Sequence, residues 1–335
     1  MSATVGLIAN PAAGRDIRRL TAHASVVPNH EKASIVRRVL HGLAAAGVDT
    51  VVYLADNAGI MAAAVDGGRP PVAMEPLGHR AHGWASDSTA AAGLLAAAGV
   101  GAIVTLGGDG TNRAVAAACG DVPLVAVSTG TNNVFPTMVD GTVAGLAAGL
   151  VATGAVEPDR VASRAKRVEV EATGTTDFAL IDAAACTDPF VGARAIWDPG
   201  RVLALVLTRA EPWSVGLSAI GGQLRPLAPG EPAGLYVELG DGPEVVAAVA
   251  PGVVARVPVA SWRLLALGEP VTLGGGARTV ALDGERELAV DGGASAAVTL
   301  TGPRVVDIRA TLAAAAGSGG AEGARRGGAD GGRRG

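Results

Sequence analysis

The chain has 335 residues, 49% of them hydrophobic, which is enough for two domains or one large domain with a sizeable core. Its formal net charge of −4 argues against a broad surface for nucleic acid or for anionic membranes, since such surfaces need clustered positive charge. Cys119 and Cys186 are isolated, so neither a disulfide framework nor a CxxC metal motif is present. The N-terminus lacks a signal-peptide pattern, and we predict a cytoplasmic protein without stable membrane association.

The first part of the chain alternates predicted strands and helices. Short apolar runs at 4–9, 50–55, 102–106 and 122–127 predict strands, and the segments 31–46, 86–99 and 112–119 predict helices. Buried strands separated by helices are typical of parallel βαβ units, so residues 1–137 are predicted to form a doubly wound α/β domain. In the irregular stretch between them, His79 and His82 show no Cys or carboxylate partner, and we interpret both as surface residues rather than metal ligands.

The pattern changes after a predicted helix at 141–152. Seven predicted strands follow, at 167–172, 177–185, 201–208, 234–239, 262–267, 278–282 and 296–300. Turns with Gly and Pro separate them, without long helices, which indicates a β-rich, sandwich-like domain over 138–302. A strand and a helix at 303–316 are expected to return to the first domain. Residues 317–335 contain Gly, Ala and Arg without periodicity, which is typical of a disordered tail.

Three loops of unusual composition follow strands of the first domain, at 10–15, 107–112 and 128–133. In a parallel sheet these loops meet at the carboxyl edge, where open α/β sheets bind ligands. Glycines allow backbone N–H groups to approach phosphate oxygens, a helix N-terminus adds positive charge, and hydroxyl and amide side chains can bind a base or ribose. The candidate nucleotide-binding residues are Asn10, Gly14, Arg15, Gly107, Gly108, Gly110, Thr111, Asn112, Thr129, Gly130, Thr131, Asn132 and Asn133.

Asp109 is a carboxylate placed between glycines that should attract anions. It can accept a proton from an attacking hydroxyl or hold Mg²⁺, and capping of the following helix is the purely structural alternative. The sequence contains no GxxxxGK[ST], GxGxxG, GxSxG or HExxH motif, which excludes P-loop, dehydrogenase-type, hydrolase and zinc-protease patterns. Glycine-rich loops suited to phosphates, together with a carboxylate that can serve a hydroxyl or Mg²⁺, favour transfer of a phosphoryl group from a nucleoside triphosphate to a small-molecule hydroxyl.

The order of these loops resembles the superfamily that joins NAD kinases with diacylglycerol and sphingosine kinases. That superfamily carries an NPxxG loop, a GGDG loop, a TGT-type loop and a late DG(E/Q) element, found here at Asn10–Gly14, Gly107–Thr111, Thr129–Asn133 and Asp283–Glu285. The resemblance implies ATP and Mg²⁺ as cofactors, with Asp109 as general base. It also implies that Asp283 and Glu285 approach the nucleotide or its metal, although Asp283-Gly284 is equally consistent with a hairpin turn.

Within that superfamily the chain is most similar to the ATP-NAD-kinase-like proteins encoded with acetoin catabolism genes. This resemblance implies NAD(H) as the leading acceptor, and relatives commonly form homo-oligomers. The Asn-Glu pair that binds the NAD ribose in NAD kinases is missing from 179–184. Lipid kinases place an acidic residue near there for the substrate head group, so the resemblance makes Asp182 the candidate substrate contact. Arg194 is a second candidate that could reach a phosphate, and a surface ion pair is the alternative for it. A lipid kinase and a non-catalytic nucleotide-binding regulator remain as alternatives.

Overall fold

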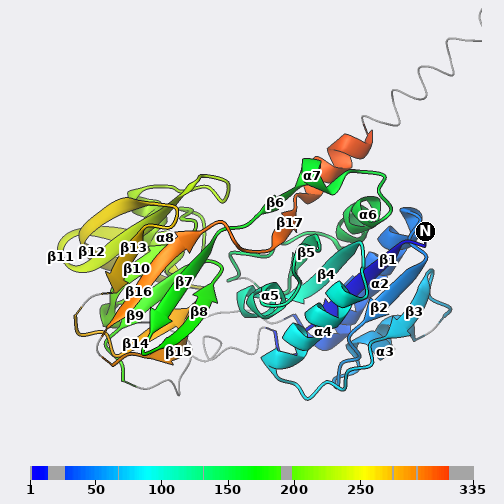
Figure 1. The fold of residues 1–335 in the computed structure, drawn as a ribbon, viewed down its shortest axis with the longest axis horizontal. Coiled ribbons are helices and arrows are strands. Elements are labelled where there is room, and N and C mark those ends of the chain that lie inside the picture. The colour runs from blue at the N-terminus through cyan, green and yellow to red at the C-terminus, as the bar shows by residue number, and fades with distance from the viewer. Residues whose placement is uncertain are drawn as a thin grey trace, which may run out of the picture.

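A computed structural model describes residues 2–13, 27–66, 68–130, 132–189, 198–273, 275–291 and 293–316, which form two lobes side by side (Figure 1). The first lobe contains a seven-stranded sheet of order β3-β2-β1-β4-β5-β17-β6. All neighbouring strands are parallel except β17 and β6. The strands are β1 (Thr4–Ala9), β2 (Thr50–Tyr53), β3 (Ala73–Pro76), β4 (Ala102–Gly107), β5 (Leu124–Ser128), β6 (Ala162–Arg164) and β17 (Arg304–Val306).

Helices cover both faces of this sheet, because its strands are apolar on both sides. One core cluster joins the sheet to α2 (Asn29–Ala45), α3 (Ile60–Val65), α6 (Gly141–Ala152) and the helical residues 308–316. Another joins the opposite face to α4 (Ala85–Ala97) and α5 (Asp109–Ala116). The predicted doubly wound α/β fold is therefore confirmed.

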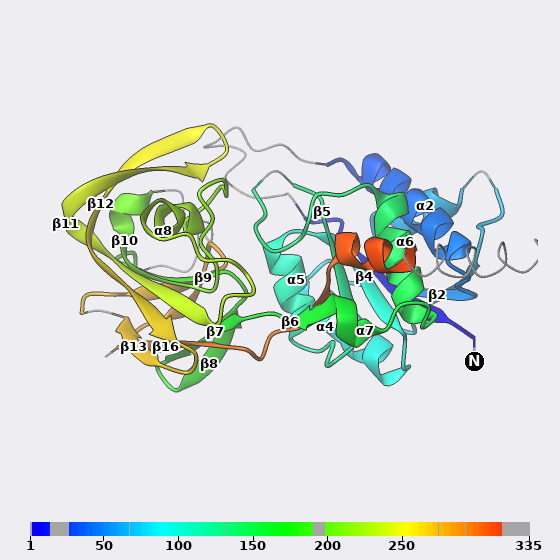
Figure 2. The ribbon, with the colours of Figure 1, turned by 90° about the horizontal axis from the view of Figure 1, so that it is seen from above.

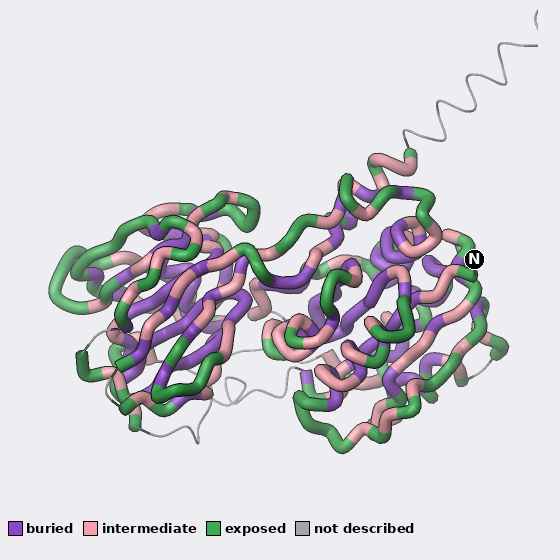
Figure 3. The backbone as a smooth tube through the Cα atoms, in the orientation of Figure 1, coloured by how far each residue is buried: buried purple, intermediate pink, exposed green. Residues whose placement is uncertain are grey.

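The second lobe contains two antiparallel sheets, which confirms the predicted β-rich fold. The six-stranded sheet has β12 (Val253–Ala266), β11 (Ala233–Ala250), β10 (Val202–Leu207), β9 (Asp182–Cys186), β14 (Thr279–Leu282) and β15 (Glu285–Ala289) in that order. The four-stranded sheet has β13 (Pro270–Leu273), β16 (Ala294–Thr299), β7 (Arg167–Ala172) and β8 (Thr175–Ala179). One apolar core fills the space between the two sheets, and α8 (Ser218–Leu224) covers the other face of the larger one (Figures 2 and 3).

The helix α6 belongs to the first lobe, so the domain boundary predicted at 137/138 is placed too early. Its glycines let it approach α2 closely: a Cβ on Gly145 would lie 2.2 Å from the carbonyl oxygen of Val39. The chain then continues through the single turn α7 (Pro158–Val161) to β6, which pairs with β17 in the first sheet. It crosses to the second lobe only after Arg164.

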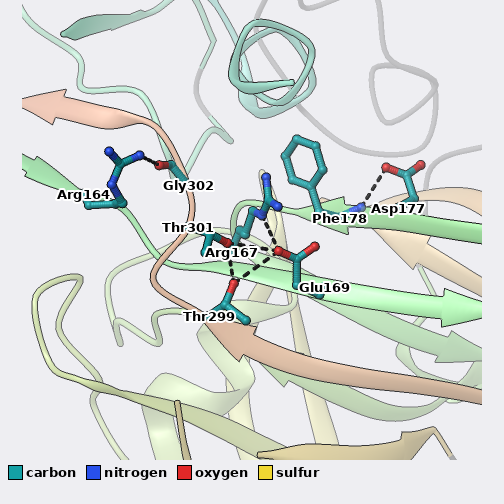
Figure 4. A network of polar contacts seen from close by, with 8 residues as sticks. All are labelled: Arg164, Arg167, Glu169, Asp177, Phe178, Thr299, Thr301 and Gly302. Carbon is teal, nitrogen blue, oxygen red and sulfur yellow. Dashed lines mark hydrogen bonds and ion pairs between the residues drawn. The ribbon is translucent and has the colours of Figure 1, made fainter. Parts of the chain in front are cut away.

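Two short segments connect the lobes, and hydrogen bonds join them to each other (Figure 4). Arg164, at the end of β6, donates from Nη1 to the carbonyl oxygen of Gly302 (3.0 Å). Glu169 on β7 accepts hydrogen bonds from Arg167 (2.6 Å) and Thr301 (3.0 Å). The outgoing and returning segments are therefore fixed side by side. Among the described residues, none of the helices has both the length and the apolar character needed to cross a lipid bilayer.

Candidate active site

A cleft of about 500 Å³ opens where the loops after β1, β4 and β5 face the second lobe. The strands β1 and β4 are neighbours in the sheet although β2 and β3 lie between them in the chain, so the order of the strands reverses at this point. Loops diverge at such a switch point and leave a crevice at the carboxyl ends of the strands. The hairpin of β14 and β15 and the end of β8 close the cleft from the other side.

The loop after β1 is held by hydrogen bonds at both ends. The side-chain amide of Asn10 donates to Thr111 Oγ1 (2.9 Å) and its oxygen accepts from the backbone of Ala12 (2.8 Å). Lys32, in the first turn of α2, is 1% exposed and donates to the carbonyl oxygens of Asn10 (3.0 Å) and Ala13 (3.0 Å). A buried ammonium group therefore fixes the main chain of this loop.

The glycines of the loop after β4 have separate tasks. A Cβ on Gly107 would lie 2.4 Å from Thr111 Oγ1, and one on Gly108 would lie 2.7 Å from Asn133 Oδ1, so both leave room for neighbouring side chains. Only Gly110 has open space around its Cβ position, and it lines the cleft. Close packing of the loops thus explains why Gly107 and Gly108 are glycines. At Gly110 the open space would let a ligand approach the main chain closely.

Asp109 begins α5, but it does not cap that helix. Its carboxylate accepts hydrogen bonds from the backbone N–H groups of Phe135 (2.8 Å) and Val134 (3.0 Å), which follow the loop after β5. Burial raises the pKa of Asp109 to about 6, the negative charge of Asp283 adds to this, and the two amides and Arg209 oppose it. An acid with a pKa near 6 in a cleft is suited to accept a proton at neutral pH.

Asp283 reaches the same place from the second lobe. It forms the turn between β14 and β15 with Gly284, and both have positive φ, 52° and 80°. Its carboxylate accepts from the N–H groups of Ile181 (2.7 Å) and Leu180 (3.0 Å). Burial raises the pKa of Asp283, while Arg113 and these amides oppose the rise. From sequence, Asp283 could be either a turn residue or a residue of the site, and in the structure it is both in the hairpin turn and in the lining of the cleft.

Acidic groups dominate the described lining of the cleft. Five carboxylates line it, and Arg113 is the one basic side chain among the lining residues that the structure describes. Arg113 belongs to α5 and forms ion pairs across the cleft with Asp177 on β8 (2.9 Å) and Glu287 on β15 (3.5 Å). It therefore links the two lobes across the cleft.

Nine of the eighteen residues proposed from sequence line this cleft. The lining includes Asn10, Gly108, Asp109, Gly110, Thr111, Asn132, Asn133, Asp283 and Glu285. Gly107, Asn112, Thr129 and Gly130 lie behind them. Asn112 is fully buried and bonds Thr105 (2.7 Å) and the carbonyl of Gly108 (2.9 Å), so it supports the loop and does not face a nucleotide. Gly14, Arg15, Thr131 and Arg194 lie outside the described residues.

Asp182 does not line the large cleft. It is 6% exposed and borders a small adjoining cavity of about 20 Å³ together with Asp109 and Asp283. Its carbonyl oxygen accepts from the backbone N–H of Asp283 (2.9 Å). The backbone of Asp182 therefore supports the Asp283 turn, and its side chain borders the small cavity, so the substrate contact expected from sequence stays a prediction.

Sequence reasoning missed several residues of the site. These residues are Lys32, Arg113 and Arg209. Arg113 directly follows the predicted loop 107–112, whereas Lys32 and Arg209 are far in sequence from the loops that they support, and nothing in their local sequence marks these two. Arg209 donates to the carbonyl oxygen of Val134 (3.2 Å) and lies over the ring of Phe135, 5.5 Å from its centre. Its guanidinium group thus contacts the two residues, Val134 and Phe135, whose N–H groups donate to Asp109. The rarity of lysine in this chain was the one available signal for Lys32.

The chain matches two family models in succession. Residues 5–155 match the ATP-NAD kinase N-terminal domain, and residues 166–302 match the acetoin catabolism protein X C-terminal domain. Together with the fold, these matches define a protein of the NAD kinase-like superfamily. The acetoin catabolism protein X of Cupriavidus necator is 40% identical over 314 residues, which cover 88% of this chain and 87% of that protein. The chain belongs to the acetoin catabolism protein X family.

Solved structures with a similar arrangement include two of a Bacillus anthracis strain Sterne protein provisionally named a diacylglycerol kinase. Their identities to this chain are 14% and 13%, and the TM-scores are 0.44 and 0.41. Each comparison covers 90% of this chain and 97% of the other. At this level of similarity we draw no conclusion about substrate.

Proposed function

We propose that the protein is an ATP-dependent kinase that phosphorylates a hydroxyl group of a small molecule, with NAD(H) as the leading acceptor. The observation that carries this proposal is the carboxylate of Asp109, whose pKa is raised to about 6. This carboxylate lines a cleft built from glycine-rich loops and the N-terminus of α5. A bound phosphate donor would meet the N–H groups of the first turn of α5, which favour anions.

Asp109 would act as the general base. An ionised carboxylate can accept about four hydrogen bonds. Among the described residues, only the N–H groups of Val134 and Phe135 donate to that of Asp109, so acceptor capacity remains for a substrate hydroxyl. The hydroxyl oxygen forms a bond to the γ-phosphorus, the bond to the ADP oxygen breaks, and the proton passes to Asp109. The N–H groups of Val134 and Phe135 would hold the carboxylate in place during this transfer.

The charge of the cleft fits a magnesium-dependent donor. Five carboxylates and one described arginine would repel a bare triphosphate, so a divalent cation is needed to offset the charge. Mg²⁺ commonly binds one or two carboxylates together with phosphate oxygens, and Asp283 and Glu285 are the residues that would hold it here. Bound in this way, Mg²⁺ would neutralise charge on the phosphate oxygens.

Two aromatic side chains in the cleft support an acceptor with flat rings. Trp84 is 73% exposed and lines the cleft at the start of α4, and Phe178 on β8 lines it from the second lobe. An exposed indole in a binding cleft offers stacking area for a nicotinamide or adenine ring. NAD(H) supplies both rings and a ribose hydroxyl.

The test is incubation with ATP, Mg²⁺ and a panel of acceptors (NAD⁺, NADH, sugars, diols and long-chain alcohols), read by mass spectrometry for an added phosphate. We expect phosphorylated NAD⁺ or NADH, and Asp109→Asn should lower kcat about 10²–10⁴-fold. Near-normal turnover by that variant would reject Asp109 as base. Calorimetric binding of ATP without product from any acceptor would indicate a nucleotide-binding regulator instead, and phosphate on the long-chain alcohol alone would indicate a lipid kinase.

A further inference from the structure

His79, His82 and Asp87 converge at the start of α4, on the outer side of the cleft wall. The Nε2 atom of His79 lies 3.0 Å from Asp87 Oδ1, and Nδ1 of His82 lies 3.5 Å from the same oxygen. All three donor atoms lie within 4.8 Å of one another, the one such group of three among the residues that the structure describes. Both histidines therefore have a carboxylate partner, which was not apparent from sequence because it comes from the next element, although His82 is exposed as a surface residue should be.

The carboxylate of Asp87 is fixed in the orientation that directs Oδ1 at both rings. Its other oxygen, Oδ2, accepts from the N–H groups of Gly83 (2.7 Å), His82 (2.9 Å) and Trp84 (3.0 Å). Burial opposes ionisation of Asp87, but the hydrogen bonds from His79 and these amides outweigh it and lower its pKa to about 2. Partners of this kind orient metal-binding carboxylates in proteins.

We propose that His79, His82 and Asp87 form a binding site for a divalent transition metal of the zinc class, a proposal that does not depend on the kinase function. In a tetrahedral zinc site with bonds of roughly 2.0–2.1 Å, neighbouring donor atoms lie about 3.3 Å apart. The separations of 3.0 and 3.5 Å between the histidines and Asp87 are close to this value, and the two histidine nitrogens lie within 4.8 Å of each other. Two imidazole nitrogens and one carboxylate oxygen suit zinc and not magnesium, which prefers oxygen ligands. Since the side chain of His82 is 62% exposed, water can supply the fourth ligand.

The proposed metal site lies next to a segment of chain that forms one wall of the cleft. The five residues Gly83 to Ser86 and Ser88 line the cleft, and they follow His82 directly or flank Asp87. A metal ion bound to side chains on both sides of this segment would fix the turn that carries Trp84. The site would therefore stabilise one wall of the cleft from behind.

The test uses the full-length chain without an affinity tag, stripped of metal and dialysed, then titrated with Zn²⁺ by calorimetry and with Co²⁺ by visible absorption. We expect one zinc per chain and the strong absorption of tetrahedral cobalt. Removing a partner outside the ligand shell commonly costs 10–100-fold in affinity, so His79→Ala and His82→Ala should each weaken binding by about 100-fold or more. His41→Ala, which changes an exposed histidine on α2, is the matched control and should bind as the wild type does.

Three results would overturn the proposal. They are the absence of zinc binding by the wild-type chain, binding unchanged in either histidine variant, and magnesium binding with equal affinity. Because His82 is largely exposed, its variant should fold normally, and far-ultraviolet circular dichroism checks this. As a second readout, zinc should change the tryptophan fluorescence of the wild type, and Trp84→Phe should remove that change.

Discussion

Replacing Asp109 by Asn should stabilise the protein at neutral pH. Burial raises the pKa of this carboxyl from 3.8 in the unfolded chain to about 6 in the folded protein. The folded state therefore binds the proton more tightly, so the stability of the wild type falls as pH rises from about 4 to about 6 and is constant above. The difference between the two pKa values lowers the free energy of unfolding by about 3 kcal/mol at pH 8, as an upper limit.

Asn retains the shape of Asp109 and an oxygen that accepts from Phe135, but it carries no charge. We expect Asp109→Asn to be more stable than the wild type by about 1–3 kcal/mol at pH 8, and the difference should vanish near pH 4. The assay is urea unfolding followed by circular dichroism at both pH values. Asp121→Asn is the control, because Asp121 is an exposed carboxylate whose hydrogen bond with Arg164 lowers its pKa, and its loss should not stabilise the protein.

The reasoning is refuted if Asp109→Asn is less stable than the wild type at pH 8, or if the difference is the same at both pH values. Either result would mean that the amides of Val134 and Phe135 fully compensate the buried charge. Combined with the kinetic test, the expected result is a variant that gains stability while it loses turnover. Such an outcome would show that the folded protein keeps an unfavourable charge where the proposed chemistry needs it.

Two further substitutions test packing and loop support. Gly42→Ala would place a Cβ 2.2 Å from the carbonyl oxygen of Thr142, where α2 meets α6, and should lower the free energy of unfolding by about 1–3 kcal/mol. Gly93→Ala is the control, because no atom lies within 3.4 Å of its new Cβ, and it should be neutral or stabilising. Equal urea midpoints for the two variants would contradict this. Lys32→Met should raise the KM for ATP, because three carbonyl groups of the loop after β1 lose their hydrogen-bond donor. Lys166→Met is the control, because it removes a similarly buried ammonium group from three carbonyl groups of the second lobe. This variant should be less stable than the wild type but should leave the KM for ATP unchanged.

The elements of the first lobe followed closely from hydrophobic patterning. The helix predicted at 31–46 is α2 (Asn29–Ala45), and the strands predicted at 4–9 and 102–106 are β1 and β4. Patterning was less informative for the long hairpin, where predicted strands at 234–239 and 262–267 are parts of β11 (Ala233–Ala250) and β12 (Val253–Ala266). Residues 240–243 (Gly-Asp-Gly-Pro) are typical of a turn, but β11 continues through them with an irregularity in its pairing. Beyond this point one face of the hairpin is apolar, because Ala247, Val249, Val257 and Val259 are buried in the core cluster that includes α8, and this alternation was missed.

The domain boundary could not be placed from sequence for a different reason. The helix α6 is apolar around most of its circumference, so its pattern does not indicate which surface it packs on. Contact with α2 depends on glycines at 42 and 145 that allow the two backbones to approach, and these belong to helices a hundred residues apart. Such complementarity exists only once both helices are formed.

The class of fold and the loops that meet at the carboxyl edge of the sheet could both be predicted from the amino-acid sequence. These properties depend on short segments: apolar periodicity, glycines in turns, and strand order constrained by right-handed connections. Only the tertiary structure decided which charges face one another. Asp109 meets Asp283, Arg113 meets Asp177, and the histidines of an irregular loop meet Asp87, because side chains far apart in sequence become neighbours only through the docking of lobes and helices.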